Sequence, residues 1–529
     1  MAFTFQINND VHFNHDKKLL ATATAAVSAL KMKTITPKGL VTLTHDDSKL
    51  GGVWTKPAAS QKLEQPLKKG DSIIIDFGNH YVGHFSVHIN SVGSPMDAPL
   101  TLRVKFAEMP VELSQNSTDY KGWLSSSWIQ EELLHLDVLP TNLQLPRRYS
   151  FRYVQLTVVD TSPKWQASFS NARVATSSSV DASAFQAPKV KDPELQRIYN
   201  AGLKTLEDCM QTVFEDGPKR DRRLWLGDLR LQALADYATF DDTQLVKRCL
   251  YLFGGMTAED GRIPANVFTN PSDTPDDTFL FDYSLFFVSV LSDLMLHKLD
   301  TDVLNDLYPI AKKQMDLSLT QVDDQGQLVL DDSYPVFIDW SNDFDKATAG
   351  QAILIYTLKQ FIALTQLRGD DPAPYTAALK QLTHFALTDL YDQKAGLFVS
   401  GPKREFNIAS QVWMTLAAVL PQAETKALMQ RTIDQLFPVK GIATPYMYHH
   451  VVEALFVSGL TDQAVTLMKQ YWGKMIDLGA DTFWEAFDPD KPDYSPYGSA
   501  LLNSYCHAWS CTPVYLINRY LLKEGQDHG

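Results

Sequence analysis

Residues 215–230 read EDGPKRDRRLWLGDLR and hold the densest group of reactive side chains in the sequence. Asp216, Asp221 and Asp228 alternate there with arginines such as Arg220, and Trp225 lies among them. Solvated helix faces usually mix Lys and Glu with Ala or Leu, whereas a site for a polar ligand needs carboxylates, guanidinium groups and aromatic surface at fixed positions. The alternative is a salt-bridged helix start with Asp216 as the cap. From local composition alone, both interpretations stay open.

A second unusual stretch covers residues 478–498, LGADTFWEAFDPDKPDYSPYG. Glu485 directly follows Trp484 and precedes Phe487, so its surroundings are aromatic. Aromatic surface desolvates a carboxylate, and desolvation raises its pKa. A glutamate at a loop edge without a chemical role is the alternative. Because glycosidases place two carboxylates on opposite sides of one sugar ring, two acidic, tryptophan-containing segments together favour glycoside hydrolysis more than either alone.

Three further loops combine polar and aromatic side chains, as a sugar-binding surface does. They contribute Asp282, Trp340 and His507, which we predict to bind substrate together with Trp484. For each of these residues, structural packing is the alternative. Asp276 and its neighbour could hold a cation, but their spacing matches no calcium loop, so no metal is expected.

Other chemistries lack their motifs. The sequence has no phosphate-binding loop, no GxGxxG after a strand, no HExxH and no GxSxG elbow. No nucleotide or other cofactor is therefore expected. The formal net charge of −14 argues against a nucleic-acid partner, since such partners select basic surfaces.

Membrane insertion and secretion are not expected either. No run approaches eighteen apolar residues, and the N-terminus lacks a basic stretch followed by an apolar one. The 4 cysteines are too few for a disulfide framework. These features predict reduced thiols in a cytoplasmic protein. The oligomeric state stays open, with homodimerisation through either domain as a plausible arrangement.

Residues 1–185 carry the pattern of an antiparallel β-sandwich. Short alternating apolar runs are separated by turn residues, at 72–77, 85–89, 100–106 and 153–159. The histidines within this region, His80, His84 and His88, are scattered, and we interpret them as surface or structural residues. A small, polar segment at about 175–190 is the expected linker.

Residues 190–529 carry apolar positions at helical spacing through roughly twelve segments. Long loops rich in Asp, Trp, Tyr and Pro alternate with short ones. Long loops within a compact domain usually serve function. Paired helices with every second loop long predict an (α/α)6 barrel whose inner helices carry their loops to one mouth. The expected fold is thus a β-sandwich followed by an (α/α)6 catalytic domain.

Four motifs resemble the α-L-rhamnosidases of glycoside hydrolase family 78, especially the compact two-domain bacterial members. They are DGPKRDRR at 216–223 with WLGD at 225–228, GADTFWE at 479–485, CHAW at 506–509 and LPRRYSFRY at 145–153. Together with the strands before them they span about residues 70–520, and the first motif is specific.

The resemblance implies a catalytic (α/α)6 barrel behind a β-sandwich, and hydrolysis with anomeric inversion. It implies Asp221 as the general acid, where larger members usually have Glu, and Glu485 as the general base. Positions lining the sugar site correspond to Asp216, Arg220, Trp225, Asp228 and His507.

The expected substrates are therefore small glycosides or short oligosaccharides with a terminal α-L-rhamnose. For Asp221 to carry a proton near neutral pH, we expect the arginines around it to point at Asp216 and Asp228 or at sugar hydroxyls. Two alternatives remain at this stage. One is another (α/α)6 glycosidase that acts on glucosides or uronides, and the other is a carbohydrate-binding protein without catalysis.

Overall fold

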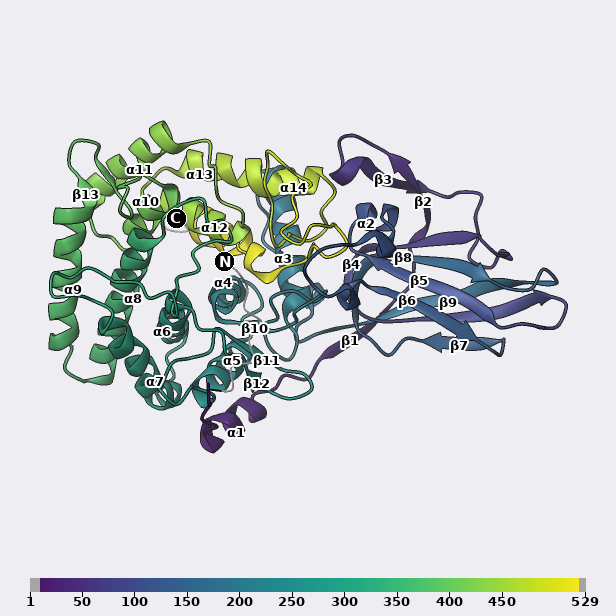
Figure 1. Ribbon diagram of the computed structural model, residues 1–529, viewed down its shortest axis with the longest axis horizontal. Helices are drawn as coiled ribbons and strands as arrows, with labels where there is room; N and C mark the ends of the chain where they lie inside the picture. The colour runs from purple at the N-terminus through teal and green to yellow at the C-terminus, as the bar shows by residue number, and fades with distance from the viewer. Residues whose placement is uncertain (1–9, 523–529) are drawn as a thin grey trace.

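The computed structural model describes residues 10–522 and consists of a β-sheet domain beside a helical domain (Figure 1). The expected chain limits at 1 and 529, and part of the N-terminal stretch considered above, lie outside this range. No helix within the described range is both long and apolar enough to cross a bilayer.

The sheet domain contains one antiparallel nine-stranded sheet, as the alternating sequence pattern predicts. Its main path runs β1-β9-β4-β8-β5-β6, while β2 pairs with β3 and β4, and β7 pairs with β4. Inward side chains such as Phe85, Val104 and Phe151 form its core. The strands are β1 Lys31–Ile35, β2 Gly39–His45, β3 Val53–Pro57, β4 Ser72–Gly93, β5 Leu100–Ala107, β6 Glu131–Leu136, β7 Thr141–Gln144, β8 Tyr149–Asp160 and β9 Trp165–Ser178.

A bulge interrupts the long strand β4 and directs side chains toward the helical domain. Asp76 pairs with Tyr153 and Tyr81 with Phe151, so the residues between Asp76 and Tyr81 face a single partner residue. Gly78 supports this bend with φ of +83°, a conformation that favours glycine. The bulge explains why His80, interpreted from sequence as a surface or structural residue, is buried between the two domains.

The helical domain has two sets of helices. Helices α4, α6, α8, α10 and α12 contact one another in succession, and α4 also contacts α15. Each of these six contacts at least one helix of a second set, formed by α3, α5, α7, α9, α11 and α13 (Figure 1). The bounds are α3 Pro193–Cys209, α4 Leu226–Tyr237, α5 Thr243–Gly255, α6 Phe281–His297, α7 Thr301–Leu319, α8 Ala347–Arg368, α9 Ala373–Phe385, α10 Ile408–Leu416, α11 Gln422–Leu436, α12 Pro445–Val457, α13 Thr461–Met468, α14 Lys474–Asp477 and α15 Pro513–Ile517.

Burial follows from side-chain pattern in both sets. Helix α6 is apolar almost all round and is buried on nearly every side, whereas α11 buries a narrow stripe and exposes polar residues. Side chains cap several helix starts, including Asp192 at α3 and Thr444 at α12. Helix α6 of the first set is thus enclosed by protein, whereas α11 of the second set exposes one face to solvent.

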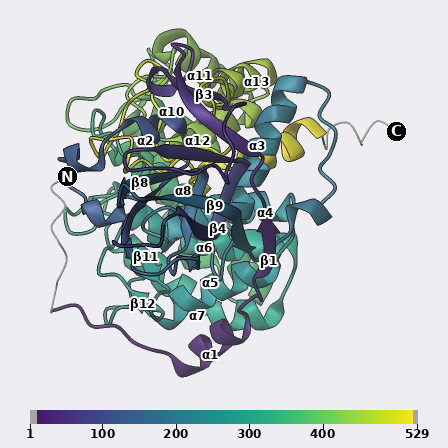
Figure 2. The same cartoon turned by 90° about the vertical axis from the view of Figure 1, so that its right-hand side faces the viewer.

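The first helix, α1 (Lys17–Ala25), precedes the sheet in sequence but packs against α5 of the helical domain (Figure 2). Leu19 and Ala23 are buried there, and the Arg248 guanidinium donates to the Ala23 carbonyl at 2.9 Å. Residues 10–26 therefore differ from the rest of the expected 1–185 domain, because their contacts are with helices. At the other end of that domain, β9 continues to Ser178, inside the expected linker.

Candidate active site

The segment between α3 and α4 forms a tight loop closed by Asp216. The Asp216 N–H donates to the Arg223 carbonyl at 2.9 Å, and the Asp216 carboxylate accepts the Arg223 N–H at 3.0 Å. The interpretation of Asp216 as a helix cap is wrong, because α4 begins ten residues later with Trp225 at its N-cap position. The first reactive segment is thus a loop, built to present side chains rather than to start a helix.

Two consecutive residues at the tip of this loop adopt left-handed backbone conformations. Asp221 has φ of +60° and Arg222 has φ of +55°. Each such residue costs about 1 kcal/mol or more when it is not glycine. Such strain persists only where the surroundings hold it, and it concentrates at functional sites. The loop therefore accepts an unfavourable backbone conformation that fixes the direction of the Asp221 carboxylate.

Glu485 is held by two donors. Arg220 donates to its Oε2 and Tyr497 donates to its Oε1. The Glu485 backbone is anchored as well, since its N–H donates to the Ser504 carbonyl at 3.0 Å and its carbonyl accepts from the Trp509 indole at 2.9 Å. Arg220 is fixed in turn by the Leu502 carbonyl at 2.8 Å and by the face of the Tyr497 ring. Residues about 260 positions apart are thereby brought into one buried group.

Asp228 and His507 form the third part of the group. The His507 Nδ1 lies 3.5 Å from Asp228 Oδ1, and both side chains are buried. Neither of these two atoms has a hydrogen-bond partner within the described residues. His507 comes from the same C-terminal segment as Ser504, which bonds Glu485. Buried polar atoms without partners are costly, so these two are available for a bound ligand.

Burial and nearby carboxylates raise the pKa values of two neighbouring aspartates. Burial, followed by the charges of Asp221 and Asp228, raises the pKa of Asp216 well above its usual value. Burial, followed by Glu485 and Asp221, does the same to the pKa of Asp228. Burial and the nearby Arg220 lower the pKa of His507 well below its usual value, so the ring is neutral.

Glu485 experiences opposing influences. Burial raises its pKa above the usual value, while the positive charge of Arg220 and the Tyr497 hydroxyl oppose that rise. Arg220 stays charged because Glu485, Tyr497 and Asp221 together outweigh the effect of its own burial and raise its pKa. Arg220 and Tyr497 thus limit, but do not cancel, the rise in the Glu485 pKa that burial causes.

Asp221 differs from the other carboxylates in its access to solvent. Its side chain is 24% exposed, against 6% for Glu485 and 2% for Asp228. One oxygen lies 3.6 Å from an Arg220 nitrogen, beyond normal hydrogen-bond distance. A proton on Asp221 could therefore reach a molecule that arrives from solvent, while the other three carboxylates form the buried floor.

The arginines of the loop do not point where the sequence led us to expect. Arg220 bonds Glu485 rather than Asp216 or Asp228. Arg222 donates to backbone carbonyls, including that of Arg148 at 2.7 Å, and Arg223 lies over the Phe268 ring. Asp221 nevertheless escapes strong pairing, because two of the three arginines point away from it.

Comparison with known proteins assigns this arrangement to a family. Residues 37–176 match the glycosyl hydrolase family 78 alpha-rhamnosidase N-terminal domain, and residues 184–521 match the bacterial alpha-L-rhamnosidase 6 hairpin glycosidase domain. The chain belongs to the α-L-rhamnosidases of glycoside hydrolase family 78. The resemblance drawn from the sequence motifs is confirmed, and the protein is a glycoside hydrolase.

Solved structures of rhamnosidases share the fold. A rhamnosidase from Klebsiella oxytoca with rhamnose bound is 45% identical, with a TM-score of 0.93 over 96% of this chain and 100% of that chain. A family 78 rhamnosidase of Bacillus sp. GL1 is 20% identical, with a TM-score of 0.71 over 85% of this chain and 46% of that one. The alpha-L-rhamnosidase of Streptomyces avermitilis is 23% identical over 472 residues, which cover 85% of this chain but 42% of that protein. The chain thus spans about two fifths of the length of this curated relative.

The remaining predicted residues of this rhamnosidase-family chain lie in different surroundings. Trp225 is half-buried beside the Tyr283 ring, which approaches because Gly227 has no side chain to obstruct it. Trp484 is fully buried and packs edge-on against Phe487 and Tyr505. Trp484 therefore lies behind Glu485 as part of the core, which leaves it little surface for a ligand.

Asp282 and Trp340 belong to the support of the loop at 331–347. The Asp282 carboxylate accepts the backbone N–H groups of Phe337 and Ile338, both at 3.0 Å, and is fully buried. Trp340 is half-buried and packs edge-on against Phe337. The Asp282 contacts indicate that this carboxylate fixes a loop, since both of its oxygens are occupied by the protein itself.

Tyr497 is the functional side chain that sequence reasoning missed. It lies in the stretch DYSPYG, where no sequence pattern distinguishes it from Tyr494. The structure distinguishes the two, since Tyr497 is buried against Arg220 and Glu485 while Tyr494 is 36% exposed. A usable signal was its position within the same acidic, aromatic loop as Glu485.

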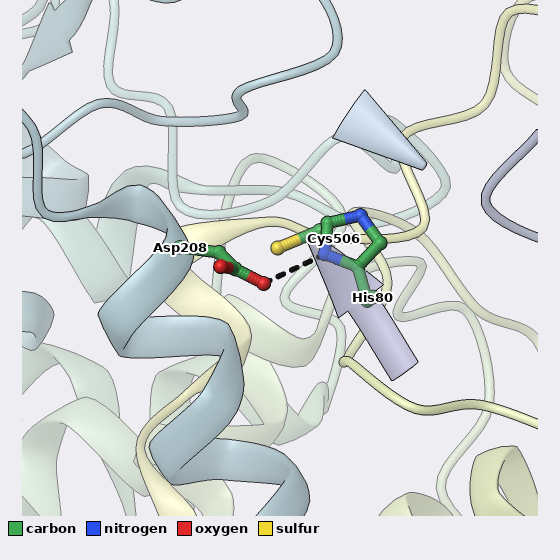
Figure 3. A group of neighbouring side chains, drawn as sticks. All are labelled: His80, Asp208 and Cys506. Atoms are coloured by element: carbon green, nitrogen blue, oxygen red, sulfur yellow. Dashed lines mark hydrogen bonds and ion pairs between the residues drawn. The ribbon is translucent and has the colours of Figure 1, made fainter. Parts of the chain in front are cut away.

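Among residues 10–522, one group combines metal-ligand atoms: His80, Asp208 and Cys506 (Figure 3). The two ring nitrogens of His80 are already within hydrogen-bond distance of Asp208 at 2.7 Å and of Glu108 at 3.0 Å. Hydrogen bonds therefore account for the contacts of this ring. All four cysteines are free and buried, as predicted.

Proposed function

We propose that the protein removes terminal, non-reducing α-L-rhamnose from glycosides or short oligosaccharides by an inverting acid–base mechanism. The observation that carries this proposal is the buried, doubly held Glu485 in one group with the accessible Asp221. The relatives described as rhamnosidases, one of them with rhamnose bound, support the choice of sugar. The succession of helix contacts, together with the six-hairpin description, supports an (α/α)6 barrel behind a β-sandwich as the scaffold.

In this proposal Asp221 is the general acid. It protonates the glycosidic oxygen as the bond to the leaving group breaks. Two features support the role: its exposure to solvent, and its left-handed backbone, which aims the side chain.

Glu485 is the general base in the same proposal. It accepts a proton from a water molecule that attacks the anomeric carbon on the face opposite the leaving group. Arg220 and Tyr497 hold both carboxylate oxygens, which orients the group and opposes the rise in its pKa that burial causes. In an inverting enzyme the two carboxyl groups lie roughly 6.5–9.5 Å apart to leave room for that water.

The other members of the group position the sugar. Asp216, Asp228 and His507 would bind hydroxyls, and the unpartnered atoms of Asp228 and His507 suit that role. Rhamnose lacks a hydroxyl at its sixth carbon, so its methyl group requires an apolar wall. The half-buried Trp225 and the adjacent Tyr283 offer such a wall.

Hydrolysis of a panel of aryl glycosides tests the activity, with α-L-rhamnoside expected to react fastest. Asp221→Asn and Glu485→Gln should each lower kcat by about 10²–10⁴-fold, since each removes one proton-transfer group. Circular dichroism should show that both variants keep the fold. Near-full activity in either variant would show that the residue has another role.

The stereochemistry requires its own measurement. Proton NMR of the sugar released in the first minutes of reaction should show the β-anomer of L-rhamnose. Initial release of the α-anomer would exclude inversion while leaving the substrate assignment intact. Rutinose-type and neohesperidose-type substrates, compared side by side, would then define the preferred linkage.

A further inference from the structure

Ion pairs join the two domains, and each reaches a segment of the candidate active site. Arg148, the residue before strand β8, pairs with Glu215 at 2.6 Å, and Glu215 directly precedes Asp216. Arg152 of the same strand pairs with Asp481 at 2.9 Å, four residues before Glu485. The third and most buried contact is centred on a carboxylate of the sheet domain, that of Glu108.

Glu108 follows strand β5 and is only 2% exposed. Its Oε2 accepts the backbone N–H of Tyr505 at 2.7 Å and lies 3.7 Å from the ammonium of Lys219. Its Oε1 accepts the Ser150 hydroxyl at 2.7 Å and lies 3.0 Å from the His80 ring. One carboxylate thus contacts two segments of the helical domain that are far apart in sequence.

Both of those segments contain or adjoin the proposed catalytic residues. Lys219 directly precedes Arg220 and Asp221. Its ammonium donates to Glu112, a second buried carboxylate of the sheet domain, at 2.5 Å and to the Asn503 carbonyl at 2.7 Å. Tyr505 stands two residues before His507 and next to Ser504, whose carbonyl holds the Glu485 backbone. The segment with the proposed acid and the segment that supports the proposed base therefore meet at Glu108.

The charges around Glu108 are balanced, so that it can stay ionised although buried. The His80 ring contacts Asp208 at 2.7 Å (Figure 3). Its other nitrogen contacts Glu108 at 3.0 Å, and Asp208 accepts from Lys204 at 2.8 Å. Burial would lower the pKa of His80, but Cys506, Asp208 and Glu108 raise it well above its usual value. Lys219 and His80 together keep the pKa of Glu108 below its usual value despite burial.

We propose that Glu108 of the sheet domain is a positioning residue for hydrolysis, because it joins the Lys219–Asp221 and Asn503–His507 segments in one arrangement. This inference rests on the proposed acid–base function of those segments. The sheet domain is then part of the catalytic machinery, although no side chain of it touches the reacting atoms.

The test is Glu108→Gln in the full chain, with Glu108→Asp as a charge-preserving companion. Both substitutions should lower kcat by about 10-fold or more with little change in KM, because the acid and base are displaced while sugar contacts remain. The Glu108 charge raises the pKa of Glu485. Removing it in Glu108→Gln should therefore shift the acidic limb of the kcat/KM profile to lower pH, whereas Glu108→Asp should leave that limb in place.

The matched control is Glu132→Gln, which alters an ion-paired carboxylate of the sheet domain. Glu132 accepts from Arg147 and Tyr149 and touches neither segment. Its kcat and pH profile should match those of the wild type. If Glu108→Gln does not fold, Ser150→Ala removes one donor to Glu108 and should reduce kcat by a smaller factor.

Hydrogen exchange gives a readout that needs no substrate. Peptides covering 216–223 and 500–507 should exchange faster in Glu108→Gln than in the wild type. A wild type that cleaves no aryl glycoside would contradict the proposed function alone. Unchanged kcat, pH limb and exchange in folded Glu108→Gln would overturn the positioning role, as would lower stability with unaltered catalytic constants.

Discussion

At the scale of single residues, the site is defined by which carboxylate has a cation and which does not. Arg220 bonds Glu485, whereas no arginine or lysine side chain among the described residues bonds Asp216 or Asp228, and burial raises the pKa of both. A glycosidase needs one ionised and one protonated carboxyl group at the same pH. Arg220 bonds the proposed base directly but lies 3.6 Å from the proposed acid, Asp221, so the two carboxyl groups are held differently.

Tyr497→Phe should make this dependence measurable. The Tyr497 hydroxyl lowers the pKa of Glu485, so its removal raises that pKa. The base works only when ionised, and activity is lost as pH falls through its pKa. The acidic limb of the kcat/KM profile should therefore move to higher pH, with about tenfold lower kcat/KM on that limb, as expected for the loss of a hydrogen bond to a charged group.

Tyr308→Phe is the matched control for Tyr497→Phe. Its buried hydroxyl donates to Thr365 between two helices, away from the carboxylates. Its pH profile should coincide with that of the wild type. A Tyr497→Phe limb that stays in place, or moves to lower pH, would show that the hydroxyl does not stabilise the ionised base.

Residue types and spacing predicted the members of the site better than their contacts. Asp221 and Glu485 could be selected because both lie in acidic, aromatic loops and match motifs of a known family. The bond from Arg220 to Glu485 could not be predicted, because it depends on how two loops about 260 residues apart meet. Tyr497 was missed for the same reason, since only that meeting distinguishes it from Tyr494.

At the scale of elements, loops near the site are fixed by buried carboxylates that accept backbone N–H groups. Asp282 holds Phe337 and Ile338, and Asp339 holds Ala443 and Thr444. The loop at 331–347 is thereby tied to α6 and to the start of α12. Ile338 has φ of +55°, which a branched residue adopts only under such restraint.

Asp282→Ala should therefore reduce stability more than it alters substrate binding. It leaves two buried N–H groups without acceptors, at about 1–3 kcal/mol each. Urea unfolding should show a loss of several kcal/mol, while KM changes little in the molecules that remain folded. Our sequence prediction of a substrate-binding Asp282 would instead require a raised KM at unchanged stability.

Alternation and helical period predicted the two kinds of domain, because both patterns report which side of an element is buried. They did not predict where α1 packs. Its nine residues bury only Leu19 and Ala23, and such a short stripe fits a sheet face as well as a helix. The bulge in β4 could not be predicted from the sequence either, because it follows from the register with β8 rather than from local composition.

At the scale of the whole molecule, the first described segment packs on the helical domain, the next forms the sheet domain, and the rest of the chain forms the helical domain. That first segment is residues 10–26, whose backbone N–H groups donate to the Gly255 and Thr257 carbonyls at the end of α5. The sheet domain is consequently joined to the helical domain before its first strand and after its last one, as well as by the ion pairs between the domains. We infer that the N-terminal helix stabilises the helical domain, although it precedes the sheet in sequence.

Leu19→Ala tests that inference. Leu19 is buried against Gly254 and Gly255 of α5, and truncating a buried leucine typically costs about 2–5 kcal/mol. Hydrogen exchange should rise in α5 and its neighbours, while β4 and β8 keep their protection. Val27→Ala, just beyond the helix and 43% exposed, should change stability by less than about 0.5 kcal/mol. Faster exchange in the sheet strands instead of α5 would assign the N-terminal helix to the sheet domain, against the contacts described above.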